Sequence, residues 1–536
     1  MSCRPVSRRS VELGFWFPAV AVLATVAALI PSAGLARSGA GAVPRPAGGT
    51  QRLARAVASQ DWPAYLFSSH HPSATTGSAT ITLGNAGSLT AAWKFQEQPP
   101  TGTGQPPGGF SASPTVADGM VFIGSQTGDL YALQESTGQL VWKKTLDYEQ
   151  VGNNGNCKNV RGIVGTATVA ADPQTGKPTV YIPGARYLYA LDAATGAQDW
   201  KSLVGPAGSA TVVGAYFNYA SPTVQNGLVY EGVSSSCDLP LVRGGVQAFS
   251  QQTGSLQHTI WTDPAGQVGA SVWSSEATTN PWVYVTTGDP KPTGTQQYYG
   301  NSFLRLNSTT LALRDSWQLK LQAPDLDFGS SPTLFDGTVN GVSTSLVGAC
   351  SKNGRYYALR RSALGRGPVW SVRVGAADHT GQGECLASAV WNSQASALYL
   401  AGNTTSINGN TYDGSVREVN PGTGTTGWAT GLSCEVIGTP ALDAATGVLA
   451  VATWAKPCLN GSPHVYLLNA ATGAILGTLP LNVGGFAQPV FAGPYLLVAD
   501  ESGQVVAYSP AAGHVRCTGW CHARHRQTRV PPIPAP

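Results

Sequence analysis

The sequence of 536 residues predicts an all-β protein, an eight-bladed β-propeller whose last blade is completed by an N-terminal strand. Three observations favour this fold. The chain is rich in Gly (65), Pro (37) and apolar residues (42%) but has only 11% charged residues. A unit of four short strands recurs about every 50 residues, and one lone strand precedes the first complete unit. This composition excludes a disordered chain, a coiled coil and a protein of long helices.

Residues 1–36 have the three parts of a secretory signal peptide. Three arginines among the first nine residues precede an apolar run from Phe15 to Ile30, and small residues lead to Ala36, after which we expect cleavage. An uncleaved anchor is the alternative, although the apolar run is shorter than the ~20 residues that span a bilayer. We therefore expect a secreted or extracytoplasmic protein without stable membrane insertion after cleavage, in which the eight remaining cysteines can form disulfides.

The rest of the chain divides into three parts. Residues 37–60 are an Ala-, Gly- and Arg-rich stretch that we expect to be a flexible linker, and residues 61–510 hold the repeats. Residues 511–536 form a basic, Pro-rich tail. Its Cys517–His522 segment resembles a c-type haem attachment motif, but three residues rather than two separate the cysteines, which favours a local disulfide.

Each repeat unit is a pair of β-hairpins. The segment Leu130–Trp142 recurs as Leu188–Trp200: an alternating apolar strand, a tight turn that contains Gly, and a strand with a large aromatic residue. A second strand pair lies ahead of it and often begins with Ser-Pro-Thr, where Pro suits the first residue of a strand. The outer-strand ends that count the blades are Trp93, Trp142, Trp200, Trp261, Trp317, Trp370, Trp428 and the segment 476–481.

The last unit, residues 488–508, has only three strands, whereas Leu89 to Phe95 forms a strand without partners. Pairing the two removes both free edges. We therefore predict that this N-terminal strand closes the ring, which brings Trp93 beside Tyr508.

The outer-strand pattern, Tyr-Ala-Leu-Asp, two small residues, Thr-Gly and Trp, resembles the repeat of the quinoprotein dehydrogenase superfamily over residues 61–509. Residues 61–65, 272–275, 283–290 and 324–332 are similar to the polyvinyl-alcohol dehydrogenase branch. The resemblance implies the propeller fold. It does not by itself imply an activity, because assembly-factor lipoproteins use the same blades without a cofactor.

The resemblance also suggests a cofactor site. Trp273 matches the Trp that lies flat under pyrroloquinoline quinone (PQQ) in the family, and Asp289 stands where the family has a calcium-binding Asn. Arg243, in an Arg-Gly-Gly stretch similar to the same branch, is a candidate for holding an anionic ligand. Asn301 occupies the position of the family's catalytic Asp and is a further cofactor-binding candidate. PQQ and calcium are thus possible cofactors.

Two departures argue against family chemistry. The amide of Asn301 cannot accept a proton from an alcohol, and the family's pair of adjacent cysteines is missing, since Cys237 has no cysteine neighbour. Asp289 or Glu276 is a conceivable replacement base. Structural roles are equally compatible with the sequence: Trp273 as an aromatic that packs between blades, and Asp289 as a turn residue.

Four arginine positions and two acids also stay open. Asp325 and Asp327 are candidates for calcium binding or for a capped, solvated loop. The candidates for lining the central channel, with a structural ion pair as the alternative, are Arg186, Arg243, Arg305 and Arg355.

Function follows from these features as two hypotheses. The first is a secreted scaffold that binds a small-molecule or protein ligand at a propeller face and has an incomplete redox site. The alternative is a PQQ- and calcium-dependent alcohol dehydrogenase of the polyvinyl-alcohol dehydrogenase type. The net charge of +4 is small for this length and the repeats contain no basic run, so we expect no nucleic-acid partner.

Overall fold

The computed structural model describes residues 61–98, 108–149, 162–209, 214–238, 240–291, 297–320, 325–376, 385–454, 458 and 461–511. The predicted signal peptide, linker and all but the first residue of the predicted tail lie outside these ranges. No helix among the described residues is both long and apolar enough to cross a membrane.

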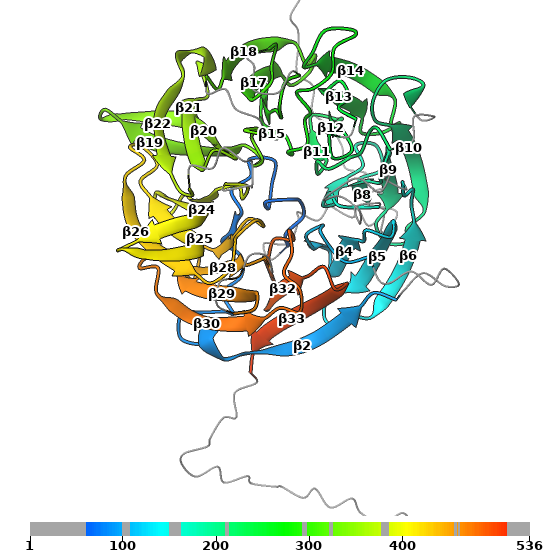
Figure 1. Ribbon diagram of the computed structural model, residues 1–536. Helices are drawn as coiled ribbons and strands as arrows, with labels where there is room; N and C mark the ends of the chain where they lie inside the picture. Colours follow the sequence, from blue (N-terminus) through cyan, green and yellow to red (C-terminus); the bar gives the residue numbers. More distant parts are fainter. Residues whose placement is uncertain are drawn as a thin grey trace, which may run out of the picture. The chain divides into compact units, whose positions relative to one another are not determined.

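The described strands form eight antiparallel blades arranged in a ring (Figure 1), as the sequence predicts. Blade 1 contains β3 (Thr115–Ala117), β4 (Met120–Gly124), β5 (Asp129–Gln134) and β6 (Leu140–Thr145). Blade 2 contains β7 (Thr168–Ala171), β8 (Pro178–Pro183), β9 (Tyr187–Asp192) and β10 (Gln198–Leu203). Blade 3 contains β11 (Thr223–Gln225), β12 (Leu228–Val233), β13 (Gly245–Ser250) and β14 (Leu256–Trp261). Blade 4 contains β15 (Ala277–Thr279), β16 (Trp282–Thr286), β17 (Ser302–Asn307) and β18 (Leu313–Gln318).

The second half of the ring contains longer strands and the closure. Blade 5 contains β19 (Thr333–Val339), β20 (Val342–Ser351), β21 (Arg355–Arg360) and β22 (Pro368–Arg373), with the 3-10 turn η4 (Leu364–Arg366). Blade 6 contains β23 (Val390–Asn392), β24 (Ala397–Ile407), β25 (Asn410–Val419) and β26 (Thr426–Leu432). Blade 7 contains β27 (Ala441–Asp443), β28 (Val448–Ala452), β29 (His464–Asn469), β30 (Ile475–Pro480) and the short β1 (Ala74–Thr75). Blade 8 contains β31 (Val490–Ala492), β32 (Tyr495–Ala499), β33 (Gln504–Pro510) and β2 (Leu89–Gln96), which η1 (Ala86–Ser88) precedes.

Closure by the N-terminal strand is confirmed. Strand β2 pairs antiparallel with β33, with Ala91 opposite Tyr508 and Trp93 opposite Ala507. Figure 1 shows β2 in blue beside the red β33. Two segments more than 400 residues apart in sequence therefore share one sheet, in which β33 lies between β2 and β32.

The tryptophan at the outer edge of a blade packs on a glycine of the next blade. In the blade 5–6 seam, the Trp370 indole Nε1 donates to the Pro421 carbonyl at 2.8 Å, and the ring lies against Gly424. A Cβ on Gly424 would lie 2.6 Å from the ring, and the residue has φ +74°, so both space and backbone conformation require glycine. The other pairs of this kind are Trp93 with Gly138, Trp142 with Gly196, Trp200 with Gly254, and Trp428 with Gly473.

The sequence did not predict the path of residues 62–78, here called the N-terminal ribbon. It runs inside the ring (blue in Figure 1) and bonds to the first strand of one blade after another. The backbone carbonyls of Ser69, His70, Pro72 and Ser73 accept N–H groups of blades 4, 5, 6 and 7, at 2.7 to 3.0 Å. The ribbon thus contributes to holding the ring together as well as leading to β2.

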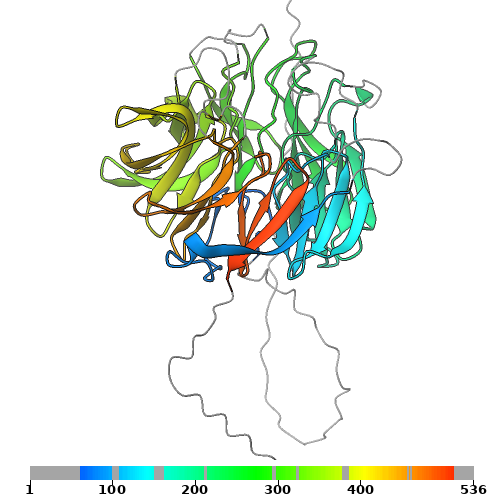
Figure 2. The same cartoon turned by 60° about the horizontal axis from the view of Figure 1, so that its bottom comes forward.

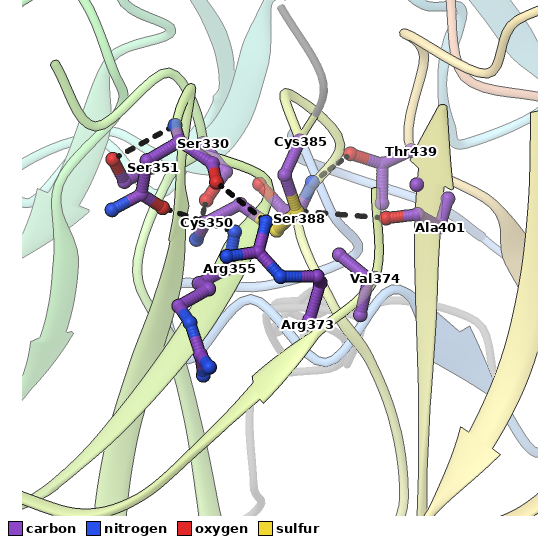
Figure 3. Close-up of a disulfide and its surroundings, with 12 residues drawn as sticks. Ser330, Cys350, Ser351, Arg355, Arg373, Val374, Cys385, Ser388, Ala401 and Thr439 are labelled. Atoms are coloured by element: carbon purple, nitrogen blue, oxygen red, sulfur yellow. Dashed lines mark hydrogen bonds between the residues drawn. A yellow bond between two sulfur atoms is a disulfide. The ribbon is translucent and has the colours of Figure 1, made fainter. Parts of the chain in front are cut away.

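Disulfides join neighbouring blades. Cys350 on β20 bonds to Cys385, in the chain that leads to blade 6, and Cys434 bonds to Cys458. Figure 3 shows the first of these, with the Cys350 backbone N–H donating to Ser330 Oγ at 2.7 Å. Cys237 is also disulfide-bonded. These bonds are consistent with an extracytoplasmic location.

Candidate functional site

The loops of blades 3 to 5 gather the candidate residues at one face of the ring. Trp273 and Asp327 precede the first strands of blades 4 and 5, whereas Asp289 and Lys352 follow the second strands of the same blades. Because adjacent strands are antiparallel, the start of a first strand and the end of a second strand lie at the same face. We call this the upper face; in Figure 2 the green loops of these blades stand at the top.

A hydrogen-bonded network connects the Trp273 indole to Lys352. Trp273 Nε1 donates to Asp327 Oδ2 at 2.7 Å, and Lys352 Nζ lies 2.8 Å from Asp327 Oδ1 and 2.5 Å from Asp325 Oδ1. The ammonium also lies over the Trp273 ring, 5.5 Å from its centroid, within the range of a cation–π contact. Burial opposes the charged form of Lys352, but Asp327 and Asp325 outweigh it and raise its pKa.

Two features hold this network in place. Lys352 follows β20, which the Cys350–Cys385 bond anchors two residues earlier. Gly329 lies between the Trp273 ring and Leu386, and a Cβ at this position would overlap Leu386. The disulfide-bonded loop therefore packs close to Trp273.

Asp289 organises the neighbouring loop. Its carboxylate accepts the backbone N–H of Asp325 at 2.6 Å and that of Leu326 at 3.2 Å. Burial and the nearby Asp327 raise the pKa of Asp289 to about 7, while a hydrogen bond from the Asn301 side chain opposes the rise. The structure thus brings Asp289, Asn301 and, through residues 325–327, Trp273 into one network.

Sequence analysis missed two residues of this site, Lys352 and Asp238. Asp238 lies in the loop after the second strand of blade 3, and its pKa depends on the charges of Asp327 and Lys352. Burial and Asp327 raise its pKa to about 6, and Lys352 opposes this rise. Both residues lie in the loop that follows a second strand, as Asp289 does in blade 4. Reading this loop in successive repeats would have grouped all three.

Arg243 is close to the site through its backbone only. It forms a β-bridge with Gly269, which in turn bridges to Pro290 beside Asp289. Its side chain points to the outer part of blade 3, where Nε donates to the Asp263 carbonyl at 2.6 Å and the guanidinium lies 4.8 Å from the Trp261 ring centroid. An anion-binding role for this side chain stays a prediction.

The other arginines contact groups in or near their own blades. Arg186 lies 3.6 Å from Glu149, Arg305 lies 3.5 Å from Asp315, and Arg355 Nη1 donates to Ser371 at 3.0 Å. These contacts are of the structural kind that the sequence left open as the alternative.

The conceivable base Glu276 lies in the interior. It precedes β15 and is fully buried, as is Glu231 on β12 of the neighbouring blade. Among the described residues, no side-chain donor contacts the carboxyl oxygens of either residue. Burial raises the pKa of Glu276 to about 8, and burial and Glu276 raise that of Glu231. A carboxyl so enclosed is out of reach of a substrate at the upper face.

The described residues contain no group of three or more His, Cys, Asp and Glu side chains arranged to hold a metal ion. The carboxyls of the upper-face site are instead spread along a network whose centre is Lys352.

Comparison with known families matches residues 62–373, more than half of the chain, to the family described as "Glucose/ethanol/alcohol dehydrogenase, beta-propeller domain". Residues 412–530 match the family of the outer membrane protein assembly factor BamB. Among curated proteins, the chain is 26% identical to a quinohemoprotein alcohol dehydrogenase of Comamonas testosteroni, over 63% of this chain and 50% of that protein. It is 24% identical to a lupanine 17-hydroxylase [cytochrome c] of a Pseudomonas species, over 47% of this chain and 40% of that protein. The chain thus spans half or less of the length of these relatives.

Solved structures agree on the fold. The Comamonas testosteroni quinohemoprotein alcohol dehydrogenase superposes with a TM-score of 0.67 at 17% identity, over 84% of this chain and 80% of that one. A europium-containing methanol dehydrogenase gives 0.67 at 16% identity, over 85% and 99%. Placement in the polyvinyl-alcohol dehydrogenase branch stays a prediction. The chain belongs to the PQQ-type β-propeller family of the glucose, ethanol and alcohol dehydrogenases.

Proposed function

We propose that this protein is an extracytoplasmic binding propeller, a scaffold for a small-molecule or protein ligand, whose upper-face site has lost the arrangement needed for quinone redox chemistry. The observation that carries the proposal is the position of Lys352, which lies over the Trp273 ring and pairs with both Asp325 and Asp327. The family fold is retained, while the groups that would serve a cofactor are bonded to one another.

PQQ does not fit the site in this arrangement. A planar cofactor needs an open aromatic face for stacking, with ring planes in offset contact. Here the Lys352 ammonium lies over the Trp273 ring and the Gly329–Leu386 contact lies beside it. Stacking would require Lys352 to leave two carboxylates, one of which, on Asp327, is buried.

Calcium does not fit well either, although carboxylate oxygens are the ligands that it prefers. Asp289 uses its carboxylate to accept two backbone N–H groups, and Asp325 and Asp327 are paired with Lys352. A calcium ion would have to displace the lysine and release the loop at residues 325–327. We therefore expect these carboxylates to have a structural role, which is to hold the loop at residues 325–327 in place.

Reconstitution tests this proposal directly. The purified secreted protein is incubated with PQQ and calcium, desalted, and assayed for bound PQQ and for dye reduction with primary and secondary alcohols. We expect no retained PQQ and no alcohol-dependent reduction. Stoichiometric PQQ that is retained by the wild type and lost in Trp273→Ala would overturn the proposal.

One observation favours the second candidate, a PQQ- and calcium-dependent alcohol dehydrogenase. The pKa of Asp289 is about 7, close to the value that suits a general base at neutral pH. In that case Asp289 would take the alcohol proton, the role that Asn301 cannot fill, and PQQ when bound would supply the hydride acceptor. The reconstitution then gives activity that is lost in Asp289→Asn.

A further inference from the structure

A cavity lies at the lower face, where first strands end and the N-terminal ribbon crosses blades 4 to 7. It encloses about 520 Å³, within the ~300–1,000 Å³ typical of small-molecule sites. Trp273 precedes β15 at the upper face, whereas Thr279 at the end of the same strand lines this cavity. The two sites thus lie at opposite ends of the same blades.

The ribbon is arranged so that alternate residues face the cavity. His71, Ser73 and Thr75 are buried, and their side chains or backbones bond to the blades: His71 Nδ1 to the Pro332 carbonyl at 2.9 Å, for example. The intervening residues are the ones that line the cavity: His70, Pro72, Ala74 and Thr76. The buried residues and the cavity-lining residues alternate along the ribbon, and His71 and Ser73 adopt positive φ values of 59° and 52° between the residues that line the cavity. The cavity therefore has a floor held by backbone hydrogen bonds to four blades.

The wall of the cavity carries a donor next to an acceptor. Arg361 Nη2 donates to Asp336 Oδ1 at 3.0 Å, and the Ser345 hydroxyl donates to the same oxygen at 2.7 Å. Arg361 Nε has no hydrogen-bond partner within the described ranges. The Arg361 side chain is 18% exposed and that of Asp336 59% exposed. The charges of this pair cancel. Burial and the nearby Arg361 also lower the pKa of His70, which keeps its imidazole neutral at neutral pH.

Aromatic side chains complete the cavity. Trp391 is half-buried and packs against Phe335, with ring centroids 5.9 Å apart, and Phe67 of the ribbon lies on the same cavity. An indole face binds the C–H face of a ring by burial and weak C–H···π contact. The side-by-side carboxylate and guanidinium suit neighbouring hydroxyls, since one accepts and the other donates.

We propose that the lower-face cavity binds a neutral saccharide unit, with its ring on Trp391 and adjacent hydroxyls on Asp336 and Arg361. Neutrality follows from the cancelled charges, because a free anion or cation would meet one attractive and one repulsive partner at similar range. This inference goes beyond the proposed function and holds whether or not the upper-face site is catalytic.

Ligand-observed NMR and calorimetry on the secreted protein test the proposal. The probes are glucose, N-acetylglucosamine, cellobiose and maltose, with benzoate and choline as charged controls of similar size. We expect at least one sugar to bind with a dissociation constant of about 1 mM or tighter, and both charged probes to bind at least about tenfold more weakly.

Variants locate the binding. Trp391→Ala and Asp336→Ala should each weaken sugar binding about tenfold or more, while Trp273→Ala at the upper face should leave it unchanged. Circular dichroism and thermal unfolding establish that each variant is folded. Absence of binding for all four sugars at ~10 mM would overturn the proposal. So would tighter binding of benzoate or choline than of any sugar, or loss of sugar binding in Trp273→Ala alone. Because PQQ is not a probe here, a negative result leaves the reconstitution experiment independent.

Discussion

The seams between the blades that the structure describes do not all pack in the same way. In five seams an outer-strand Trp packs on a Gly of the next blade, as Trp370 does on Gly424. At the seam between blades 3 and 4 the equivalent turn residue is Leu311, whose N–H makes the same turn bond, to the Asn307 carbonyl at 2.9 Å. This seam also contains the buried acids Glu231 and Glu276. The repeat thus departs from its usual Trp–Gly pattern beside the upper-face site.

The difference between the Trp–Gly seams and the blade 3–4 seam indicates which contacts the repeated sequence specifies. A Trp–Gly seam needs only a short local pattern, so it recurs wherever neighbouring blades simply have to pack. The blades on either side of the blade 3–4 seam also carry loops with Asp238, Trp273 and Asp289, and the pattern gives way there. Departure from the repeat therefore marks function more clearly than agreement with it does.

The largest expected effect comes from adding a methyl group in a regular seam. Gly424→Ala places a Cβ 2.6 Å from the Trp370 ring at φ +74°. We expect the free energy of unfolding to fall by about 3–5 kcal/mol, from overpacking together with backbone strain. Chemical denaturation measures it.

Gly447→Ala is the matched control for this substitution. Gly447 has φ +76° but nothing within 4 Å of an added Cβ, so only strain of about 1–2 kcal/mol is expected. If the free energy of unfolding falls by the same amount in the two variants, the Trp370 ring moves to make room for the methyl group and the seam is not tightly packed.

The irregular seam should make stability depend on pH. Burial raises the folded-state pKa of Glu276 to about 8 from an ordinary 4.5, so the folded protein binds a proton that the unfolded chain has released. Stability from this group is complete below pH ~4.5 and is lost as the pH rises through ~8, with a slope of about 1.4 kcal/mol per pH unit. From this residue alone, the free energy of unfolding should be about 3–4 kcal/mol lower at pH 8 than at pH 5.

Two variants separate this contribution from that of the upper-face site. Glu276→Gln should reduce the slope of the free energy of unfolding against pH up to pH ~8. Asp289→Asn should reduce this slope only up to pH ~7, because burial and Asp327 raise the pKa of Asp289 to about 7. An unchanged slope in Glu276→Gln would mean that water or a cation reaches the carboxyl and that the seam is open.

Lys352→Met probes the network at the upper face. It removes the cation that pairs with Asp325 and Asp327 in the described part of the chain. Asp327 is buried, and Asp325 is 43% exposed. Removing one partner of a buried pair costs about 3–5 kcal/mol, and the exposure of Asp325 reduces our expectation to about 2–3 kcal/mol. Thermal or chemical unfolding gives the loss.

Lys143→Met is its counterpart in a regular part of the ring. Lys143 is 43% exposed and pairs with Asp129 at 2.8 Å, so its removal should cost about 0.5 kcal/mol. A cost for Lys352→Met as small as this would show that Lys352 leaves the carboxylates readily, which would favour cofactor binding on Trp273.

Sequence alone predicted the blades and their closure because both depend on local signals: a Gly turn, an alternating strand and an outer Trp such as Trp93. It did not predict the N-terminal ribbon, whose backbone hydrogen bonds reach partners in six blades, from Val116 to Ala444, and whose own sequence has no repeat. The roles of Lys352 and Asp238 were not predicted from the sequence for a related reason. Each is a single polar residue after a strand, and its significance emerges only when blades stand side by side.

The smallest expected effect concerns Leu311, a buried residue with φ +54°, a conformation that costs a side chain about 1–2 kcal/mol. Leu311→Gly loses apolar burial but relieves this strain, so its loss in the free energy of unfolding should be reduced by about 1–2 kcal/mol. Leu306→Gly, at a buried β17 position without positive φ, should therefore cost about 1–2 kcal/mol more than Leu311→Gly. If the two variants lose the same stability, Leu311 is not strained. The glycine of the regular seams would then be required by the Trp ring alone, and not by the turn that both seams share.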